Sequence, residues 1–228
     1  MPFLINKGVE IHYLTSKGKT NKQSPLIFIP GMLGSCEQYQ QELEVFLPRQ
    51  SLSVSLRGCG QSGKPKTGYS FLEHCSDIES VIKERKYKSV FLFAYSRSVP
   101  FALNLAIRNQ KLVRGLILYD YPAKFSELTD EWVAKNEDKH LKALQQELGS
   151  CDLRDDLGKI NCPVLILAGV KSDSLLLETD KKDYMNKLAN CQIVTLKNSG
   201  HDIDIKDYDT LIFDMKQFME EIEKGEFY

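Results

Sequence analysis

The sequence predicts a single α/β domain spanning residues 1–228, built on a mostly parallel, doubly wound sheet of about eight strands. Short apolar runs such as PLIFIP (25–30) and CPVLILAG (162–169) are typical of strands that are buried on both faces of a sheet. Segments with helical spacing separate most of these runs, and this alternation favours a parallel sheet covered by helices on both sides. The 228 residues are enough for one sizeable core and fall within the size of one domain.

The elements follow one another in a regular order. FLINKGVEIHY (3–13) alternates around Asn6-Lys7-Gly8, which predicts a hairpin of two strands. The later strands are expected at 25–30, 51–56, 88–94, 114–120, 162–169 and 191–196. The helices are expected at about 35–46, 71–85, 99–109, 180–189 and 206–224.

One segment interrupts this rhythm. Residues 122–160 contain no apolar run of the strand type. Within them TDEWVAKNEDKHLKALQQEL (129–148) has helical spacing, with Thr129 as its expected N-cap. The segment is too short for a second domain, so the sequence predicts a helical lid inserted over one edge of the sheet.

Composition excludes several classes of function. Hydrophobic residues make up 42% and charged residues 27%, as in ordinary soluble domains. The formal net charge of −1 does not favour binding to nucleic acid or to an anionic membrane. No apolar stretch is long enough to cross a bilayer. Charged residues follow closely on the short apolar start of MPFLINKGVEIHY, so this segment is not expected to be a secretory signal. We therefore expect a cytoplasmic protein that acts on a small molecule; the oligomeric state is not indicated.

The sequence also predicts neither a metal nor a cofactor. The six cysteines stand apart from one another, without a C-x-x-C pair or a His-Cys cluster at zinc spacing, at positions 36, 59, 75, 151, 162 and 191. They are expected to be reduced, mostly buried thiols. No G-x-G-x-x-G follows the first strand and no phosphate-binding loop is present, so nucleotide and flavin are not expected.

Ser96 is the candidate nucleophile. It stands where the strand at 88–94 turns into the helix at 99–109, and ligand chemistry in a parallel sheet gathers at the carboxyl ends of strands. A sharp turn here pushes the serine side chain out of the sheet edge, and Ala94 and Ser98 are small enough for strand and helix to pack around it. A serine that caps a helix is the ordinary alternative.

His201 is the candidate base for Ser96. A serine nucleophile usually needs a histidine, and the chain has four. His12 falls in the N-terminal hairpin, His74 early in a helix, and His140 on the polar face of the insertion. His201 follows directly on the last strand, at the same sheet edge as Ser96, although a structural loop histidine is the alternative reading.

A carboxylate is needed to orient the histidine. Asp173 lies just past the strand at 162–169, in the loop next to that of His201, and is the preferred candidate. Asp120, which ends the preceding strand, is the alternative. Both fit the order serine, acid, histidine along the chain. Asp202 and Asp204 adjoin His201, and we expect them to be solvated charges or helix caps.

Five motifs together resemble the α/β-hydrolase superfamily, in its branch of small soluble esterases and C–C hydrolases. They are IPGMLGS (29–35), SLRGCGQSGKP (55–65), FAYSRS (93–98), LAGVKSD (167–173) and NSGHD (198–202). The resemblance covers nearly the whole chain, with three departures from the family pattern. Pro30-Gly31 replaces the usual His-Gly, Ala94 and Ser98 replace the glycines around Ser96, and the lid is short.

The resemblance implies further roles. The backbone N–H groups of Met32 and Arg97 are expected to bind the oxyanion, and Gly31 to let the backbone approach the substrate. Tyr95 and Trp132 are candidates for the substrate pocket, with packing under the elbow and in the core as their alternatives. The loop from Arg57 to Gly60 is expected to be structural.

The expected function is that of a serine hydrolase, which cleaves a carboxylester or thioester through an acyl-enzyme and needs no cofactor. C–C bond hydrolysis, amide cleavage, peracid formation and lyase chemistry on the same fold are alternatives, as is a non-catalytic receptor for a small ligand. Dehalogenases and epoxide hydrolases of the family attack with an aspartate where Ser96 stands, so they are disfavoured.

Overall fold

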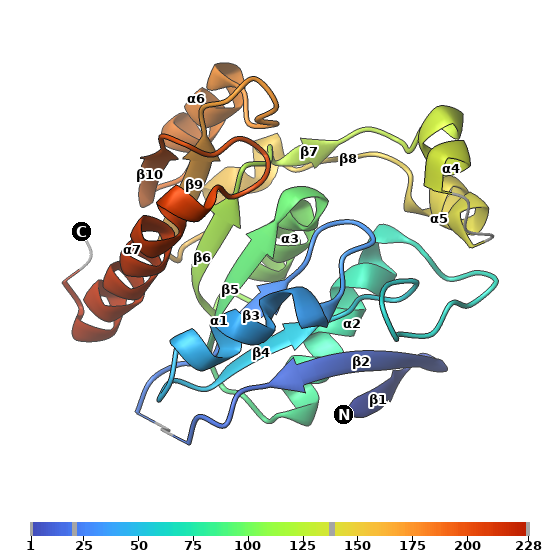
Figure 1. Ribbon diagram of the computed structural model, residues 1–228, viewed down its shortest axis with the longest axis horizontal. Helices are drawn as coiled ribbons and strands as arrows, with labels where there is room; N and C mark the ends of the chain where they lie inside the picture. The colour runs from blue at the N-terminus through green and yellow to red at the C-terminus, as the bar shows by residue number, and fades with distance from the viewer. Residues whose placement is uncertain (1, 20–21, 137–139, 227–228) are drawn as a thin grey trace.

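The computed structural model describes residues 2–19, 22–136 and 140–226, which form an eight-stranded sheet with helices on both faces (Figure 1). The strands lie in the order β1-β2-β4-β3-β5-β6-β9-β10. Their bounds are β1 Phe3–Asn6, β2 Val9–Thr15, β3 Leu26–Ile29, β4 Ser51–Val54, β5 Val90–Tyr95, β6 Val113–Tyr119, β9 Val164–Gly169 and β10 Cys191–Leu196. All pairs from β4 to β10 are parallel, while β1 and β2 are antiparallel to their neighbours. The predicted fold class is confirmed.

The hairpin of β1 and β2 turns where the sequence predicts it. Lys7 has a φ of 49° and Gly8 a φ of 80°, so both central residues of the turn lie in the left-handed region. Two such residues in succession match the twist of a two-residue hairpin. Gly8 reaches this conformation without a steric penalty.

The helices pack on the two faces of the sheet, and each face has its own hydrophobic cluster. They are η1 Cys36–Tyr39, α1 Gln40–Val45, α2 Phe71–Glu84, η2 Ser96–Ser98, α3 Val99–Arg108, α6 Glu178–Lys187 and α7 Ile205–Lys224. Residues of α2, α3 and α6 pack on one face and residues of α1 and α7 on the other. Alternate residues of β5 enter the two clusters, so the strand is buried on both sides and reads as a continuous apolar run.

The insertion between β6 and β9 contains more elements than the helical pattern of its sequence predicts. It contains β7 Lys124–Phe125, α4 Asp130–Asn136, α5 Leu141–Leu148, β8 Cys151–Asp152 and η3 Arg154–Lys159. The Trp132 N–H donates to Thr129 Oγ1 at 3.1 Å, so Thr129 caps α4 as expected. The pairing of β7 with β8 was not predicted, because two-residue strands are too short to show a period.

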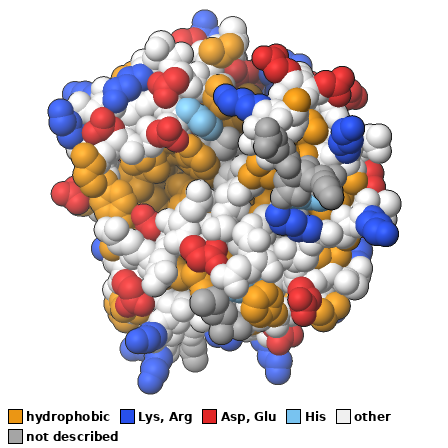
Figure 2. Space-filling view, turned by 45° about the vertical axis from the view of Figure 1, so that its right-hand side comes forward, with side chains coloured by type: hydrophobic (Ala, Val, Ile, Leu, Met, Phe, Trp, Pro, Cys, Tyr) orange, Lys and Arg blue, Asp and Glu red, His pale blue; other side chains and the backbone are white. Residues whose placement is uncertain are grey.

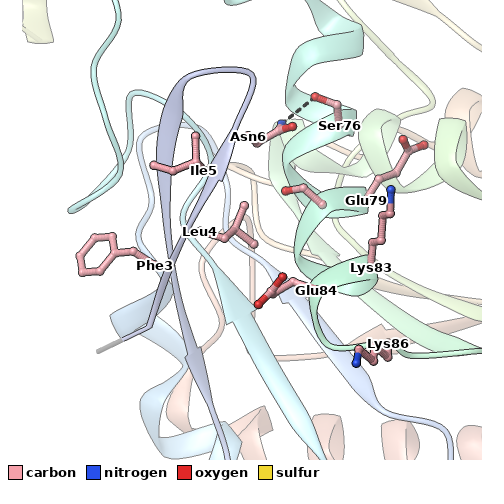
Figure 3. Close-up of a pocket in the computed structure, with 10 residues that line it drawn as sticks. Phe3, Leu4, Ile5, Asn6, Ser76, Glu79, Lys83, Glu84 and Lys86 are labelled. Carbon is pink, nitrogen blue, oxygen red and sulfur yellow. Dashed lines mark hydrogen bonds between the residues drawn. The ribbon is translucent and has the colours of Figure 1, made fainter.

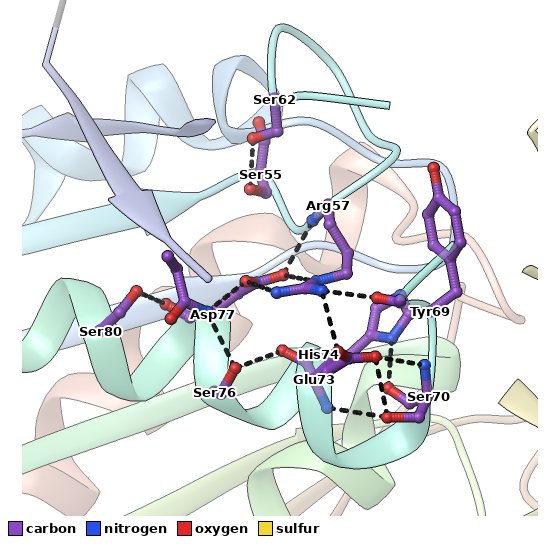
Figure 4. Close-up of polar contacts among 12 residues, drawn as sticks. Ser55, Arg57, Ser62, Tyr69, Ser70, Glu73, His74, Ser76, Asp77 and Ser80 are labelled. Atoms are coloured by element: carbon purple, nitrogen blue, oxygen red, sulfur yellow. Dashed lines mark hydrogen bonds and ion pairs between the residues drawn. The ribbon is translucent and has the colours of Figure 1, made fainter. Parts of the chain in front are cut away.

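A buried ion pair joins the segment after β4 to α2 (Figure 4). Asp77 receives hydrogen bonds from Arg57 Nε at 2.9 Å and Nη2 at 2.8 Å, and both side chains are at most 1% exposed. Arg57 also donates to the carbonyl oxygen of Gly68. The loop from Arg57 to Gly60 is therefore built around a buried, fully paired cation.

All six cysteines are free thiols; Cys36, Cys59 and Cys75 are buried and the other three are half-buried. None of the described helices combines the length and the apolar character that a bilayer crossing needs.

Candidate active site

Ser96 occupies the sharp turn between β5 and α3. Its φ is 56°, in the left-handed region that L-residues seldom adopt, so the turn holds the backbone in a strained conformation. Pro100 stands in the first turn of the following helix, where a missing N–H costs nothing. The strand, the strained turn and the helix present Ser96 at the carboxyl edge of the sheet, as expected from the sequence.

The two small residues that flank this turn are fully packed. Ala94 is 0% exposed and Ser98 is 1% exposed. Ser98 Oγ donates a hydrogen bond to the carbonyl oxygen of Pro30, which precedes Gly31. The serine that replaces a glycine therefore ties the turn to the loop after β3.

His201 meets Ser96 from the loop after β10. Its Nε2 lies 2.9 Å from Ser96 Oγ, and its side chain is 22% exposed. The loop is held by Asp207 at the start of α7, which accepts hydrogen bonds from the N–H and side-chain amide of Asn198 and from Ser199 Oγ. The predicted pairing of Ser96 with His201 is present in the geometry.

Asp120, and not Asp173, is the carboxylate that contacts His201. Asp120 Oδ2 lies 3.1 Å from His201 Nδ1 and the Asp120 side chain is 0% exposed. Asp173 is exposed, and its carboxylate lies against Gly200, where an added Cβ would meet it at 1.9 Å. The preference for Asp173 was wrong, because that residue stands four positions past the end of β9 and the intervening loop carries it to the surface.

Asp120 is held in place from several sides. It directly follows β6, with a φ of 44° that turns it out of the strand. Its carboxylate accepts hydrogen bonds from Ser174 Oγ, from the Leu175 N–H at 2.9 Å and from the Gly169 N–H at 3.3 Å. Burial raises the pKa of this carboxyl group, but the hydrogen bonds from His201 and these donors outweigh it and lower the pKa overall. Asp120 is thus a fixed anion beside the imidazole.

Tyr95 contacts His201 through both its ring and its hydroxyl group. Its ring stacks on the His201 ring with centroids 5.1 Å apart and on Tyr119 at 5.5 Å. Its hydroxyl donates to the carbonyl oxygen of His201 at 2.9 Å and to Asp202 Oδ1 at 3.0 Å. Tyr95 therefore packs under the turn and the histidine loop, which was the alternative to a place in the substrate pocket.

The loop after β3 approaches Ser96 closely at Gly31. A Cβ on Gly31 would lie 2.9 Å from the Tyr95 ring and 3.1 Å from Ser96 Cβ, so any side chain there would crowd the turn. Met32 follows Gly31, and Arg97 is in the first helical turn after Ser96, where N–H groups have no partner within the helix. Met32 is thus the next residue after the one that touches the serine turn, and Arg97 is the next residue after Ser96.

The Arg97 side chain points away from this loop to the base of the insertion. Its Nη1 donates to the carbonyl oxygen of Ser126 at 2.8 Å, and its guanidinium lies 4.9 Å from the centre of the Phe125 ring. Burial lowers the pKa of this guanidinium, which a contact with Tyr121 partly offsets. Arg97 therefore links the turn to the segment around β7.

Trp132 is the remaining pocket candidate. Trp132 packs against the main hydrophobic cluster from α4 and does not line the small cavity beside the turn. That cavity has a volume of about 10 Å³, room for about one water, and is lined by Gly31, Met32, Ser98 and His140 among others. His140 is 8% exposed at the start of α5, against Gly58 and Tyr69, so its expected place on a polar face was wrong.

Hollows larger than this cavity lie on the surface. Figure 2 shows hydrophobic side chains gathered in a hollowed region, with a histidine at its edge. A groove of about 670 Å³ separates β1 from α2, with Phe3, Leu4 and Ile5 on one side and Glu79 and Lys83 on the other (Figure 3). No residue of the serine turn lines this groove, so it is not connected to the candidate active site.

Comparison with known proteins places this geometry among related folds. The family described as "alpha/beta hydrolase fold" matches residues 24–139, about half of the chain. A curated relative, haloalkane dehalogenase from Bradyrhizobium diazoefficiens, is 30% identical over 97 residues, which is 42% of this chain and 31% of the relative. The matched region therefore spans only about a third of that relative's length.

Solved structures match over nearly the full chain. Est816, an N-acyl homoserine lactone degrading enzyme, has a TM-score of 0.79 and 17% identity, covering 95% of this chain and 100% of the other. The esterase EaEST from Exiguobacterium antarcticum has a TM-score of 0.78 and 19% identity, covering 93% of this chain and 96% of the other. At these identities the likeness concerns the fold.

Proposed function

The chain belongs to the α/β-hydrolase fold family, and on that premise we propose that it is a serine hydrolase that cleaves an ester-type bond of a small molecule. One observation supports this proposal above all others. A hydroxyl, an imidazole and a buried carboxylate lie in hydrogen-bonded sequence, from Ser96 Oγ to His201 Nε2 at 2.9 Å and from His201 Nδ1 to Asp120 Oδ2 at 3.1 Å. In this arrangement the histidine can act as the general base that activates the serine hydroxyl, and the carboxylate orients the histidine.

The mechanism follows from these contacts. His201 Nε2 accepts the proton of Ser96 as Oγ attacks the carbonyl carbon, and Asp120 stabilises the imidazolium that forms. The oxyanion is bound by the N–H groups of Met32 and Arg97. His201 then gives the proton to the leaving alcohol or thiol, and water, activated by the same base, hydrolyses the acyl-enzyme.

The relatives agree with an acyl bond as the target. Est816 degrades a lactone and EaEST is an esterase, and both substrates contain an acyl–oxygen bond. The haloalkane dehalogenase acts on a different kind of bond. Because Ser96 stands where an aspartate is expected in dehalogenases, we assign ester-type cleavage to this chain.

Substitution of Ser96 tests the proposal. Wild-type protein is expected to hydrolyse short p-nitrophenyl esters, and Ser96→Ala is expected to lower kcat by at least about 10⁴-fold because only substrate binding and the oxyanion-binding N–H groups then remain. A fluorophosphonate should label wild-type protein once, at Ser96. Ser80→Ala, which removes a helix serine outside the site, is the matched control and should retain rate and labelling. Equal activity of Ser96→Ala and wild type would overturn the assignment, as would saturable ligand binding without any turnover.

A further inference from the structure

We propose that His12, Cys36 and Glu37 form a binding site for a single thiophilic divalent cation of the zinc type. His12 comes from β2, and the other two residues begin η1. Cys36 Sγ lies 3.2 Å from His12 Nδ1 and 3.5 Å from Glu37 Oε2, and His12 Nδ1 lies 3.4 Å from Glu37 Oε1. One donor atom of each residue thus lies within 4.8 Å of the other two, and the three belong to different ligand types.

The separation of sulfur and nitrogen is close to that in a tetrahedral zinc site. Bonds of about 2.3 Å to sulfur and about 2.0–2.2 Å to nitrogen and oxygen, at tetrahedral angles, place ligand atoms about 3.3–3.6 Å apart. Cys36 Sγ and His12 Nδ1 are 3.2 Å apart, and each contacts a different oxygen of Glu37, so a small turn of this carboxylate brings one oxygen to the ion. Glu37 is 35% exposed while His12 is 0% exposed, so a fourth position can open only towards solvent, on the side of Glu37.

Charge and burial also suit a cation. Cys36 and His12 are both 0% exposed. A thiolate and a carboxylate together neutralise a divalent ion, which a buried site requires. On binding, the Cys36 thiol releases its proton to solvent as the sulfur–metal bond forms, so one proton leaves for each ion bound.

The surroundings hold the three ligands in position. Ser55 Oγ accepts a hydrogen bond from the Cys36 N–H at 2.8 Å, and Gln61 donates to Glu37 Oε1 at 2.8 Å. The Phe3 ring stacks on His12 with centroids 4.7 Å apart. Among the described residues His12 Nε2 has no hydrogen-bond partner, so the polar contacts of this buried ring all lie at Nδ1, the nitrogen that faces the thiol.

The sequence offered no sign of this site because 23 residues separate His12 from Cys36. The strand β2 and the turn into η1 bring them together. Cys36 follows the loop of Gly31 and Met32, so a bound ion fastens the end of that loop to β2. The inference does not depend on the proposed hydrolase activity, because its readout is the metal itself.

Cobalt binding to the full chain tests the proposal. Protein stripped with a chelator is titrated with Co²⁺, which reports thiolate ligation by a charge-transfer band in the near ultraviolet. We expect the band to saturate at one ion per chain and to vanish on addition of Zn²⁺. Cys36→Ser should abolish it, while Cys75→Ser, which changes an equally buried thiol in α2, should retain it.

A second variant covers the case in which Cys36→Ser does not fold. Glu37→Gln alters a side chain that is 35% exposed and should weaken Co²⁺ binding by at least about tenfold. Native wild-type protein that gives no band at saturating Co²⁺ would overturn the proposal. So would a folded Cys36→Ser variant that keeps the band, or Glu37→Gln that binds Co²⁺ as tightly as wild type.

Discussion

Asp120 and His201 face each other across the carboxyl edge of the sheet, with Oδ2 and Nδ1 3.1 Å apart, although they stand 81 positions apart in sequence. Asp120→Asn is expected to lower kcat by about 10⁴-fold because the amide no longer holds the imidazole in the required tautomer. Asp173→Asn should leave kcat within about twofold, because Asp173 is exposed. Initial rates on p-nitrophenyl esters compare the two variants. A larger loss for Asp173→Asn would reverse the assignment of the acid.

Tyr95→Phe removes a hydroxyl and keeps the ring. The variant loses the hydrogen bonds to the His201 carbonyl oxygen and to Asp202, while stacking on His201 remains. Because the histidine loop is then less firmly placed, we expect kcat to fall by roughly tenfold with little change in KM. Tyr208→Phe, which removes a hydroxyl bonded to Glu42, is the control and should leave kcat unchanged. A change in KM alone would contradict a positioning role.

Ser98→Ala removes the hydrogen bond that links the serine turn to the loop after β3. The lost hydrogen bond leaves the Pro30 carbonyl oxygen without this donor, and the expected loss of stability is about 1 kcal/mol. We expect kcat to fall as well, because the loop with Met32 is less firmly held. Ser80→Ala removes a comparable bond to the carbonyl oxygen of Asp77 and should lower stability without changing kcat. Urea unfolding and ester hydrolysis measure the two effects, and equal kcat losses in both variants would contradict the link.

Asp77→Ala removes the buried carboxylate that pairs with Arg57 and leaves the partly exposed Glu73, 3.8 Å away, as its nearest counter-ion. We expect the free energy of unfolding to fall by about 3 kcal/mol, because the guanidinium stays buried after losing its main ionic partner. Asp152→Ala breaks the exposed pair with Arg154 and is expected to leave the free energy of unfolding nearly unchanged. Urea unfolding measured by circular dichroism compares the two. Similar losses in the two variants would show that burial of the pair does not decide its contribution.

Acid should destabilise the fold in part through Asp120. The folded-state pKa of this carboxyl group lies below its ordinary value of 3.8. Between these two pH values the carboxyl group is therefore more often protonated in the unfolded chain than in the folded one. Its stabilising contribution is therefore present above pH 3.8 and is lost as the pH falls through the folded pKa. Unfolding free energies measured at decreasing pH should fall less steeply in Asp120→Asn than in wild type. An unchanged slope would show that Asp120 is not a source of the acid dependence.

Much of the fold could be predicted from the sequence because burial on both faces of a parallel strand leaves an apolar run. Each long strand was found in this way, from β3 to β10, with shifts of one or two residues at most ends. Ser96 and His201 could also be found, since Ser96 follows directly on β5 and His201 lies in the loop after β10. Thr129 was identified as the cap of α4 from its residue type and position alone.

The acid could not be decided in this way, because Asp120 and Asp173 both follow strands that end at the same edge. Only the tertiary structure shows that a left-handed φ turns Asp120 inward, where Ser174, Leu175 and His201 surround its carboxylate. Asp173 lies further along its loop and reaches solvent.

Residue order along the chain therefore determined the strands, the helices and which side chains are close to the sheet edge, because these depend on local periodicity and on the direction of parallel strands. Which of those side chains touch one another was decided by the folded molecule. Contacts such as Tyr95 with His201 and His12 with Cys36 join segments that are distant in sequence. Their geometry depends on loop conformation and packing, which leave no periodic signal in the order of residues.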